Sequence, residues 1–118
     1  MGCFWHTQHE FIEAEKDILS RKEKEYTSLT GYAGGTKTDK DGAVCYHNLQ
    51  QKADYGRLGH GEVVGMRIPE AKYQKFAHEY FKLFDKNGDR PDKGDRGSEY
   101  RHMVGIPGGV KSPLYAKL

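Results

Sequence analysis

The chain has 118 residues, of which 36% are hydrophobic and 31% are charged, and its formal net charge at pH 7 is +2. This is the length of one domain with a modest core, so we expect residues 1–118 to form a single domain. Basic and acidic residues are interspersed, and no apolar run approaches the roughly 18–20 residues that span a bilayer. The composition therefore argues against a nucleic-acid-binding protein and against a membrane protein.

Residues 4–24 predict the first helix, because their apolar positions recur at helical spacing and form one stripe. The stripe consists of Phe4, Trp5, Phe11, Ile12, Ile18 and Leu19. Residues 26–33 alternate in character and predict a strand that ends at Gly34 and Gly35. Residues 36–58 are polar and irregular, and so long a loop in a compact domain is usually functional or mobile.

Residues 61–68 predict a second strand, with Glu62 at its start on the same face as Val64 and Met66. Pro69 opens the next predicted helix, as prolines often do. Its stripe consists of Tyr73, Phe76, Ala77, Tyr80, Phe81 and Phe84. We expect this stripe to pack in the core against a sheet.

The remainder of the chain is expected to be mostly irregular. Residues 85–99 form a loop rich in glycine, aspartate and lysine, but its residues lack the spacing that a calcium loop requires. Residues 100–107 predict a short third strand, and the tail after it is rich in proline and glycine.

The stretch Gly2-Cys3-Phe4-Trp5 carries the first candidate for chemistry, because it places a cysteine at or just before the first turn of the predicted helix. A helix N-terminus presents unpaired N–H groups and the positive end of the helix dipole, which stabilise a thiolate. We therefore expect Cys3 to be a nucleophile. The two aromatic residues beside it are expected to form part of its substrate pocket.

Glu62 is the candidate general acid. It follows Gly59-His60-Gly61, whose glycines permit close backbone approach. A glutamate at the start of a hydrophobic strand loses solvent, which favours the protonated form that a general acid needs. Tyr46 and Tyr100 are candidate hydroxyl donors, and the carboxylate of Asp95 is expected to orient an arginine or a loop.

Four motifs, taken in order, resemble those of the A-type peptide methionine sulfoxide reductases. They are Gly2-Cys3-Phe4-Trp5, Gly31-Tyr32-Ala33-Gly34-Gly35, Gly59-His60-Gly61-Glu62-Val63-Val64 and Asp95-x-Gly97-x-x-Tyr100-Arg101. The proline-started aromatic helix also fits that family, so the resemblance spans nearly the whole chain. The first and third motifs together make it highly specific.

The resemblance implies a thiol-dependent enzyme that reduces methionine-S-sulfoxide, free or in a peptide, to methionine and so repairs oxidative damage. Cys3 would attack the sulfoxide sulfur and become a sulfenic acid, while Glu62 would protonate the sulfoxide oxygen. Tyr46 and Tyr100 would hydrogen-bond that oxygen. The aromatic pair Phe4-Trp5 would enclose the methyl group.

The same resemblance implies an α/β (α+β) fold, a ferredoxin-like two-layer sandwich in which two main helices pack on a mixed β-sheet. It implies no bound cofactor and an external thiol reductant, such as thioredoxin, glutaredoxin, glutathione or dithiothreitol. The partners would be free methionine sulfoxide or oxidised proteins, together with a thioredoxin-type reductant. We expect no metal, and a monomer is the default.

The chain departs from the family pattern in several places, three of which bear on the candidate site. Almost nothing precedes the cysteine motif where the family has a β-strand, so we expect a domain without that first strand. The long loop offers two candidates for its tyrosine, Tyr46 and Tyr55. The family's C-terminal resolving cysteines are absent, which leaves Cys45 as the internal thiol that could resolve a sulfenic acid on Cys3.

Two other classes of function stay open. One is a non-catalytic relative that keeps the fold and the thiol and acts as a binding module. The other is a zinc site, although no pair of ligands has zinc-finger spacing. Its shell would be drawn from Cys3, His6, His9, His60, Glu62 and Cys45.

Two cysteines in a domain of this size are not a disulfide scaffold, which favours the cytoplasm or another reducing compartment. No signal peptide is visible. Because the first motif begins at residue 2, we expect any targeting sequence to have been removed.

Overall fold

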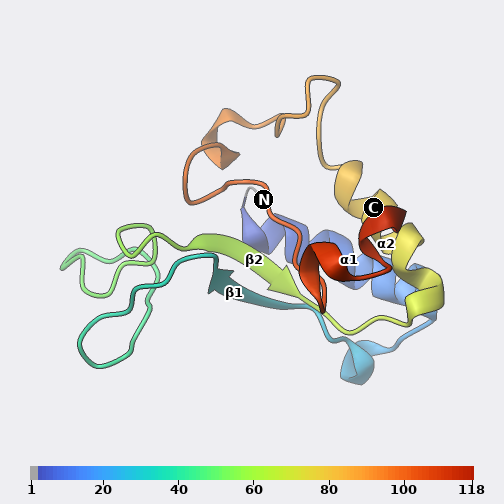
Figure 1. Ribbon diagram of the computed structural model, residues 1–118, viewed down its shortest axis with the longest axis horizontal. Helices are drawn as coiled ribbons and strands as arrows, with labels where there is room; N and C mark the ends of the chain where they lie inside the picture. Colours follow the sequence, from blue (N-terminus) through green and yellow to red (C-terminus); the bar gives the residue numbers. More distant parts are fainter. Residues whose placement is uncertain (1–2) are drawn as a thin grey trace.

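The computed structural model describes residues 3–118, in which two helices accompany a two-stranded antiparallel sheet (Figure 1). This confirms the α+β class. Gly2, the glycine before the candidate nucleophile, lies outside the described residues. A long loop, residues 34–60, extends from one end of the strands, as Figure 1 shows. Among residues 3–118, no helix combines the length and the apolar character that crossing a membrane requires.

Helix α1 (Phe4–Leu19) ends before the predicted residue 24. The chain leaves it at Ser20, whose φ of 53° is left-handed and whose N–H donates to the carbonyl of Glu15. A short 3-10 turn, Glu23–Glu25, follows. The charged residues after the helix favour helical structure locally, but here they form the connection that leads the chain back to the sheet.

Strand β1 (Leu29–Ala33) pairs with strand β2 (Gly61–Gly65) in an antiparallel register that sets Tyr32 opposite Glu62. Residues opposite each other on paired strands share a face of the sheet. The register therefore places an aromatic ring beside the candidate acid. Both strands lie inside the ranges predicted for them and are shorter.

The predicted strand over residues 100–107 is wrong, because the chain there has no regular structure. The residue just before this segment is bonded to the sheet, from the N–H of Glu62 to the carbonyl of Glu99 at 2.8 Å. A strand needs a repeated ladder, and Gly105 and Pro107 disfavour one. Within residues 3–118 the sheet is purely antiparallel, so the mixed sheet implied by the resemblance is not found there.

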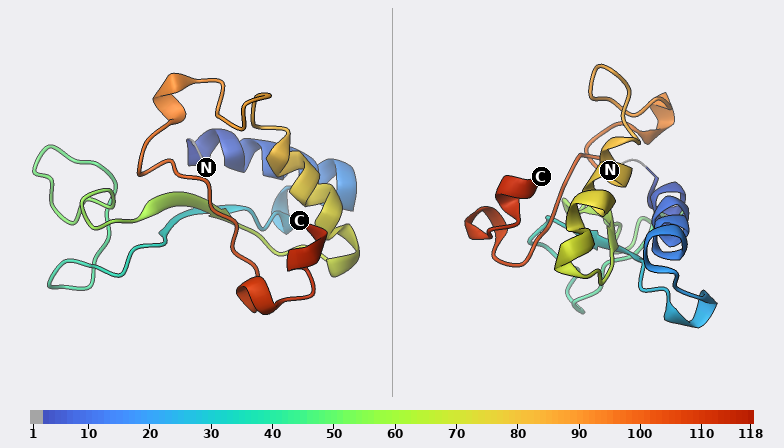
Figure 2. Two further views of the ribbon diagram at one scale, coloured as in Figure 1. Left: turned by 45° about the horizontal axis from the view of Figure 1, so that its top comes forward. Right: turned by 90° about the vertical axis from the view of Figure 1, so that its right-hand side faces the viewer.

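Helix α2 (Tyr73–Phe81) follows a 3-10 turn, Glu70–Lys72, that begins after Pro69. The core cluster consists of Phe11, Ala14, Phe76 and Tyr80, with Ile18, Leu19, Val64, Met66, Ile68 and Phe84 packed against it. The prediction that the aromatic stripe of this helix packs in the core is confirmed for Phe76 and Tyr80, but it is wrong for Phe81, which is 48% exposed. In the left view of Figure 2 both helices lie on the same side of the strands, the side that carries Val64 and Glu62.

A buried glutamate, Glu15, fastens the end of α1 to the segment that enters β1. Its side chain is fully buried. It accepts hydrogen bonds from the backbone N–H groups of Thr27 and Ser28, from both of their hydroxyls, and from Arg21 at 2.6 Å. Burial alone would raise the pKa of this carboxyl, but the hydrogen bonds outweigh it and hold the pKa of Glu15 below its ordinary value.

We expect Glu15→Gln to lower the free energy of unfolding by about 2–4 kcal/mol near neutral pH, because an amide cannot accept at both ends and leaves Arg21 without its charge partner. Since the folded-state pKa is lowered, this contribution is complete above the ordinary value of about 4.3 and is lost as the pH falls through the folded-state value. Urea unfolding of both proteins at about pH 7 and about pH 3 measures the difference, which should shrink in acid.

The matched control is Glu13→Gln. Glu13 lies on the same helix, and its partner Lys16 is 57% exposed, so its loss should cost only a few tenths of a kcal/mol. Equal destabilisation by the two substitutions would contradict the role given to Glu15.

Candidate active site

The carboxyl group of Glu62 lies at the centre of the candidate site. Glu62 is carried by β2, and only 1% of the residue is exposed. Its Oε2 accepts a hydrogen bond from the backbone N–H of Phe4, and its Oε1 accepts one from the hydroxyl of Tyr55, each at 2.8 Å. Each oxygen keeps a second lone pair, so the carboxyl group can still bond to a further partner.

Cys3 is the residue that caps the N-terminus of α1, and its thiol is free and partly buried. The carbonyl of Cys3 accepts the first helical bond, from the N–H of Thr7 at 3.2 Å. The next amide, that of Phe4, has no partner inside the helix and donates to Glu62 instead. The carboxyl group of Glu62 is thus bonded to the peptide group that follows Cys3, although the two residues are far apart in sequence.

Aromatic rings form one side of this site. Phe4 stacks on Trp5 with ring centroids 6.0 Å apart, and the ring of Tyr46 lies 6.1 Å from both. Phe4 is buried, whereas Trp5 is 63% exposed. The three rings therefore make an apolar surface that runs from the interior to solvent beside Cys3, where a methyl group could be enclosed.

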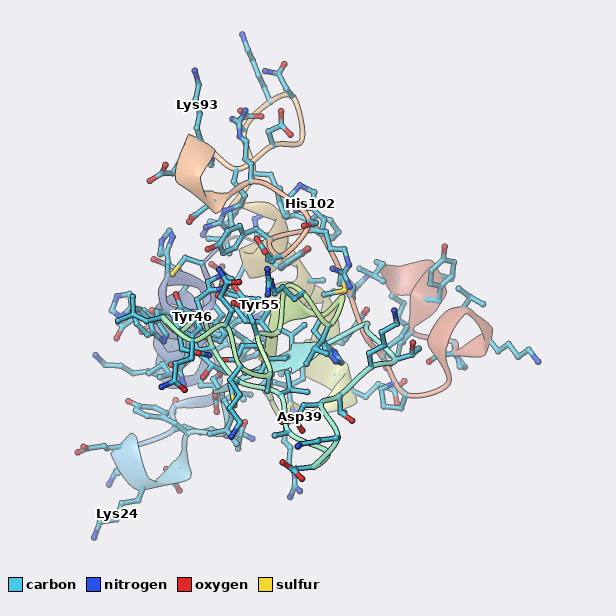
Figure 3. The ribbon with its side chains drawn as sticks, turned by 90° about the vertical axis from the view of Figure 1, so that its left-hand side faces the viewer. Lys24, Asp39, Tyr46, Tyr55, Lys93 and His102 are labelled. Carbon is cyan, nitrogen blue, oxygen red and sulfur yellow. The ribbon has the colours of Figure 1, made fainter. Side chains whose placement is uncertain are left out.

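Tyr55 is the loop tyrosine that contacts the acid. It is fully buried, and its ring stacks on Tyr46 with centroids 5.8 Å apart. Burial, followed by the hydrogen bond to Glu62, raises the pKa of Tyr55 far above its ordinary value, so its hydroxyl stays a donor. Figure 3 shows the labelled Tyr46 and Tyr55 near each other, away from Lys93 on its outlying loop.

Tyr46 occupies a different place in the same cluster. It is 42% exposed, and its ring lies beside those of Phe4 and Trp5, the two residues that follow Cys3. Burial raises the pKa of Tyr46, with smaller contributions from the charges of Glu62 and Cys3. Of the two candidates for the loop tyrosine, Tyr55 bonds directly to the carboxyl group, while Tyr46 stacks over the residues next to the cysteine.

Tyr100 and Tyr32 complete the group of hydroxyls around the acid. Burial and then the charge of Glu62 raise the pKa of both, and a hydrogen bond links Tyr100 to Tyr55. The ring of Tyr32 stacks on Tyr55 with centroids 4.7 Å apart. Tyr100 was expected here. Tyr32 was not, although its place opposite Glu62 follows from the antiparallel register of the two strands.

Asp95 orients a loop. Its Oδ2 lies 3.4 Å from the guanidinium of Arg90, which is only 2% exposed. The same guanidinium donates to Nδ1 of His6, on the first turn of α1, at 3.1 Å. Through Arg90, Asp95 is therefore connected to His6 on the first turn of the helix that follows Cys3.

Cys45 is a free and exposed thiol on the long loop. Its backbone carbonyl accepts from the N–H of Tyr55 at 2.8 Å, so Cys45 lies beside the aromatic cluster. Neither Cys45 nor Cys3 forms a disulfide in this structure.

Two of the proposed zinc ligands, His60 and His6, are engaged elsewhere. Nδ1 of His60 accepts from the N–H of Gly35 at 3.2 Å, and its Nε2 donates to the carbonyl of Lys37 at 2.7 Å. Nδ1 of His6 accepts from Arg90. Over residues 3–118, no three histidine, cysteine or acidic side chains come close enough together to hold a metal ion.

A cavity of about 500 Å³ lies between α2, the end of β2 and the segment near residue 105. Apolar side chains make up most of its lining, among them Val64, Met66, Phe76, Met103 and Ile106. Neither Cys3 nor Glu62 lines this cavity. The candidate active site is therefore separate from it.

Comparisons with family models, curated proteins and solved structures return no match to this chain.

Proposed function

We propose that this chain is a thiol-dependent methionine-S-sulfoxide reductase. The observation that carries the proposal is the position of Glu62, a buried carboxyl that bonds to the peptide group between Cys3 and Phe4. A thiol, an acid and an aromatic surface at one place are what the reduction of a methyl sulfoxide requires.

The thiolate of Cys3 attacks the sulfur of the sulfoxide while Glu62 donates its proton to the oxygen. The bond that this attack forms between the two sulfur atoms is transient: it breaks as the oxygen leaves the substrate sulfur and bonds to the sulfur of Cys3. The substrate sulfur gains two electrons and leaves as methionine, and Cys3 loses two and becomes a sulfenic acid. Solvent returns a proton to Glu62.

The remaining residues bind the substrate and orient the acid. The hydroxyl of Tyr55 fixes the carboxyl of Glu62, and Tyr46 and Tyr100 supply further donors to the sulfoxide oxygen. Phe4 and Trp5 enclose the methyl group, which gives the apolar end of the substrate a place out of water.

We also propose the finer properties that the resemblance implies. The architecture is a ferredoxin-like two-layer sandwich, which the placement of both helices on one side of the strands supports. No cofactor is bound, and the reductant is an external thiol, thioredoxin or glutaredoxin in a cytoplasmic or other reducing compartment. The substrate is free or protein-bound methionine-S-sulfoxide, and the enzyme is a monomer.

The purified chain is expected to form methionine from the S epimer of methionine sulfoxide when dithiothreitol is present, because the site holds both nucleophile and acid. Chromatography of the product measures this, and the R epimer is the control. A protein that shows a cooperative unfolding transition and still forms no methionine from either epimer would contradict the proposal.

A further inference from the structure

A histidine and an aspartate on the long loop form a second acid-base pair. Nδ1 of His47 lies 2.7 Å from Oδ2 of Asp54, whose side chain is 9% exposed while that of His47 is 40% exposed. A carboxylate only accepts, so Nδ1 carries the proton and Nε2 is left as the atom that can take one. The bond from His47 outweighs burial and holds the pKa of Asp54 below its ordinary value.

The loop backbone fixes this pair. The N–H of Cys45 donates to the carbonyl of Ala53 at 2.7 Å, and the N–H of Tyr55 donates to the carbonyl of Cys45 at 2.8 Å. The two halves of the loop are thereby joined, which sets His47 beside Asp54. The second carboxylate oxygen of Asp54 accepts from the N–H of Gly56 at 2.9 Å, so the carboxylate cannot turn away.

The pair lies on the rim of the candidate active site. The ring of His47 is 4.7 Å from that of Tyr55 and 5.3 Å from that of Tyr46, centroid to centroid. Tyr55 bonds to Glu62, and Tyr46 stacks on Trp5. The ring of Tyr46 therefore contacts both the exposed imidazole of His47 and the two aromatic residues that follow Cys3.

We propose that His47, positioned by Asp54, takes the proton from the thiol that regenerates Cys3. The inference rests on the proposed function, whose first half leaves a sulfenic acid that only a thiol can reduce. The attacking species is a thiolate, and an ordinary thiol is mostly protonated at neutral pH. An oriented imidazole that opens to solvent is a suitable proton acceptor for a thiol arriving from outside.

In this step the proton of the thiol moves to Nε2 of His47, and the thiolate sulfur attacks the sulfur of Cys3. The bond between that sulfur and oxygen breaks, and the oxygen leaves as water with the proton that His47 returns. A second thiol then breaks the mixed disulfide and restores Cys3. The two thiols lose two electrons and end as a disulfide.

The test separates the two halves of the reaction in His47→Gln and Asp54→Asn. Methionine released per chain without any thiol measures the first half, and the dependence of turnover on dithiothreitol concentration measures the second. We expect the first to stay within about threefold of wild type. We expect kcat/KM for dithiothreitol to fall about 10–100-fold near neutral pH, and to recover as rising pH ionises the thiol directly.

His78→Gln is the matched control, because His78 is an exposed histidine on α2 outside the site, and it should behave as wild type. Unchanged kcat/KM for dithiothreitol in His47→Gln overturns the proposal. So does an equal loss in both halves with no recovery at high pH, which is the result if the pair only holds the loop together.

Two further outcomes locate a failure. If the wild type releases no methionine without thiol, the proposed function itself has failed. Cys45→Ser distinguishes the sources of the thiol, and we expect it to keep full turnover because an external thiol reaches His47 directly. If Cys45→Ser loses the thiol-dependent half of the reaction, the thiol that regenerates Cys3 is Cys45 and not an external thiol.

Discussion

Cys3→Ser is expected to lower turnover with methionine-S-sulfoxide and dithiothreitol at least about a thousandfold, because a serine hydroxyl neither ionises nor accepts an oxygen atom under these conditions. The substitution replaces sulfur by oxygen at the residue before α1 and leaves the peptide group that bonds to Glu62 unchanged. The fold should therefore survive. Steady-state methionine formation gives the activity, and thermal unfolding shows that the protein is intact.

Cys45→Ser is the matched control for this prediction. It removes the other thiol of the chain, which is exposed and lies on the loop, and turnover with dithiothreitol should persist. Comparable losses in the two variants, or activity that survives in Cys3→Ser, would show that the nucleophile has been assigned to the wrong residue.

Glu62→Gln is expected to lower kcat about 100–1000-fold, because an amide can fill the same space but has no acidic proton for the sulfoxide oxygen. Its carbonyl oxygen can still accept from the N–H of Phe4, and its amide group can donate to the hydroxyl of Tyr55, so the local contacts have replacements. The loss should fall mainly on kcat rather than KM. Steady-state kinetics over a range of sulfoxide concentrations measures both.

Glu70→Gln is the control for the charge, since Glu70 is exposed and pairs with Lys117 at 3.7 Å, away from the candidate site. It should retain wild-type kinetics. Tyr55→Phe removes only the hydroxyl that fixes the carboxyl, so its effect on kcat should be smaller, about tenfold. If Glu62→Gln turns over as fast as wild type, Glu62 is not the general acid.

The helices could be predicted from sequence because their apolar spacing is a local property. The end of α1 could not be, because it depends on Glu15, whose hydrogen bonds reach forward to Thr27 and Ser28. The strand expected over residues 100–107 was wrong for a similar reason. Its pattern fits a strand, but the backbone bond to β2 comes from Glu99, the residue before it, and no ladder follows.

Likewise, only some residues of the candidate site could be predicted from the sequence. Cys3 and Glu62 stand in short motifs with a chemical rationale, so they could be chosen from sequence. The choice between Tyr46 and Tyr55 depends on how the long loop folds back on itself, and no local pattern encodes that. His47 and Asp54 were missed because neither carries a motif, and only the pairing of the two halves of the loop brings them together.

The most direct test of the central claim is a single turnover without thiol. Protein and methionine-S-sulfoxide are mixed with dimedone, which traps sulfenic acids, and both methionine and the modified cysteine are quantified by mass spectrometry. The proposed mechanism predicts close to one methionine per chain and a matching amount of adduct on Cys3. Methionine without an adduct on Cys3, or no methionine from a folded protein, would contradict it.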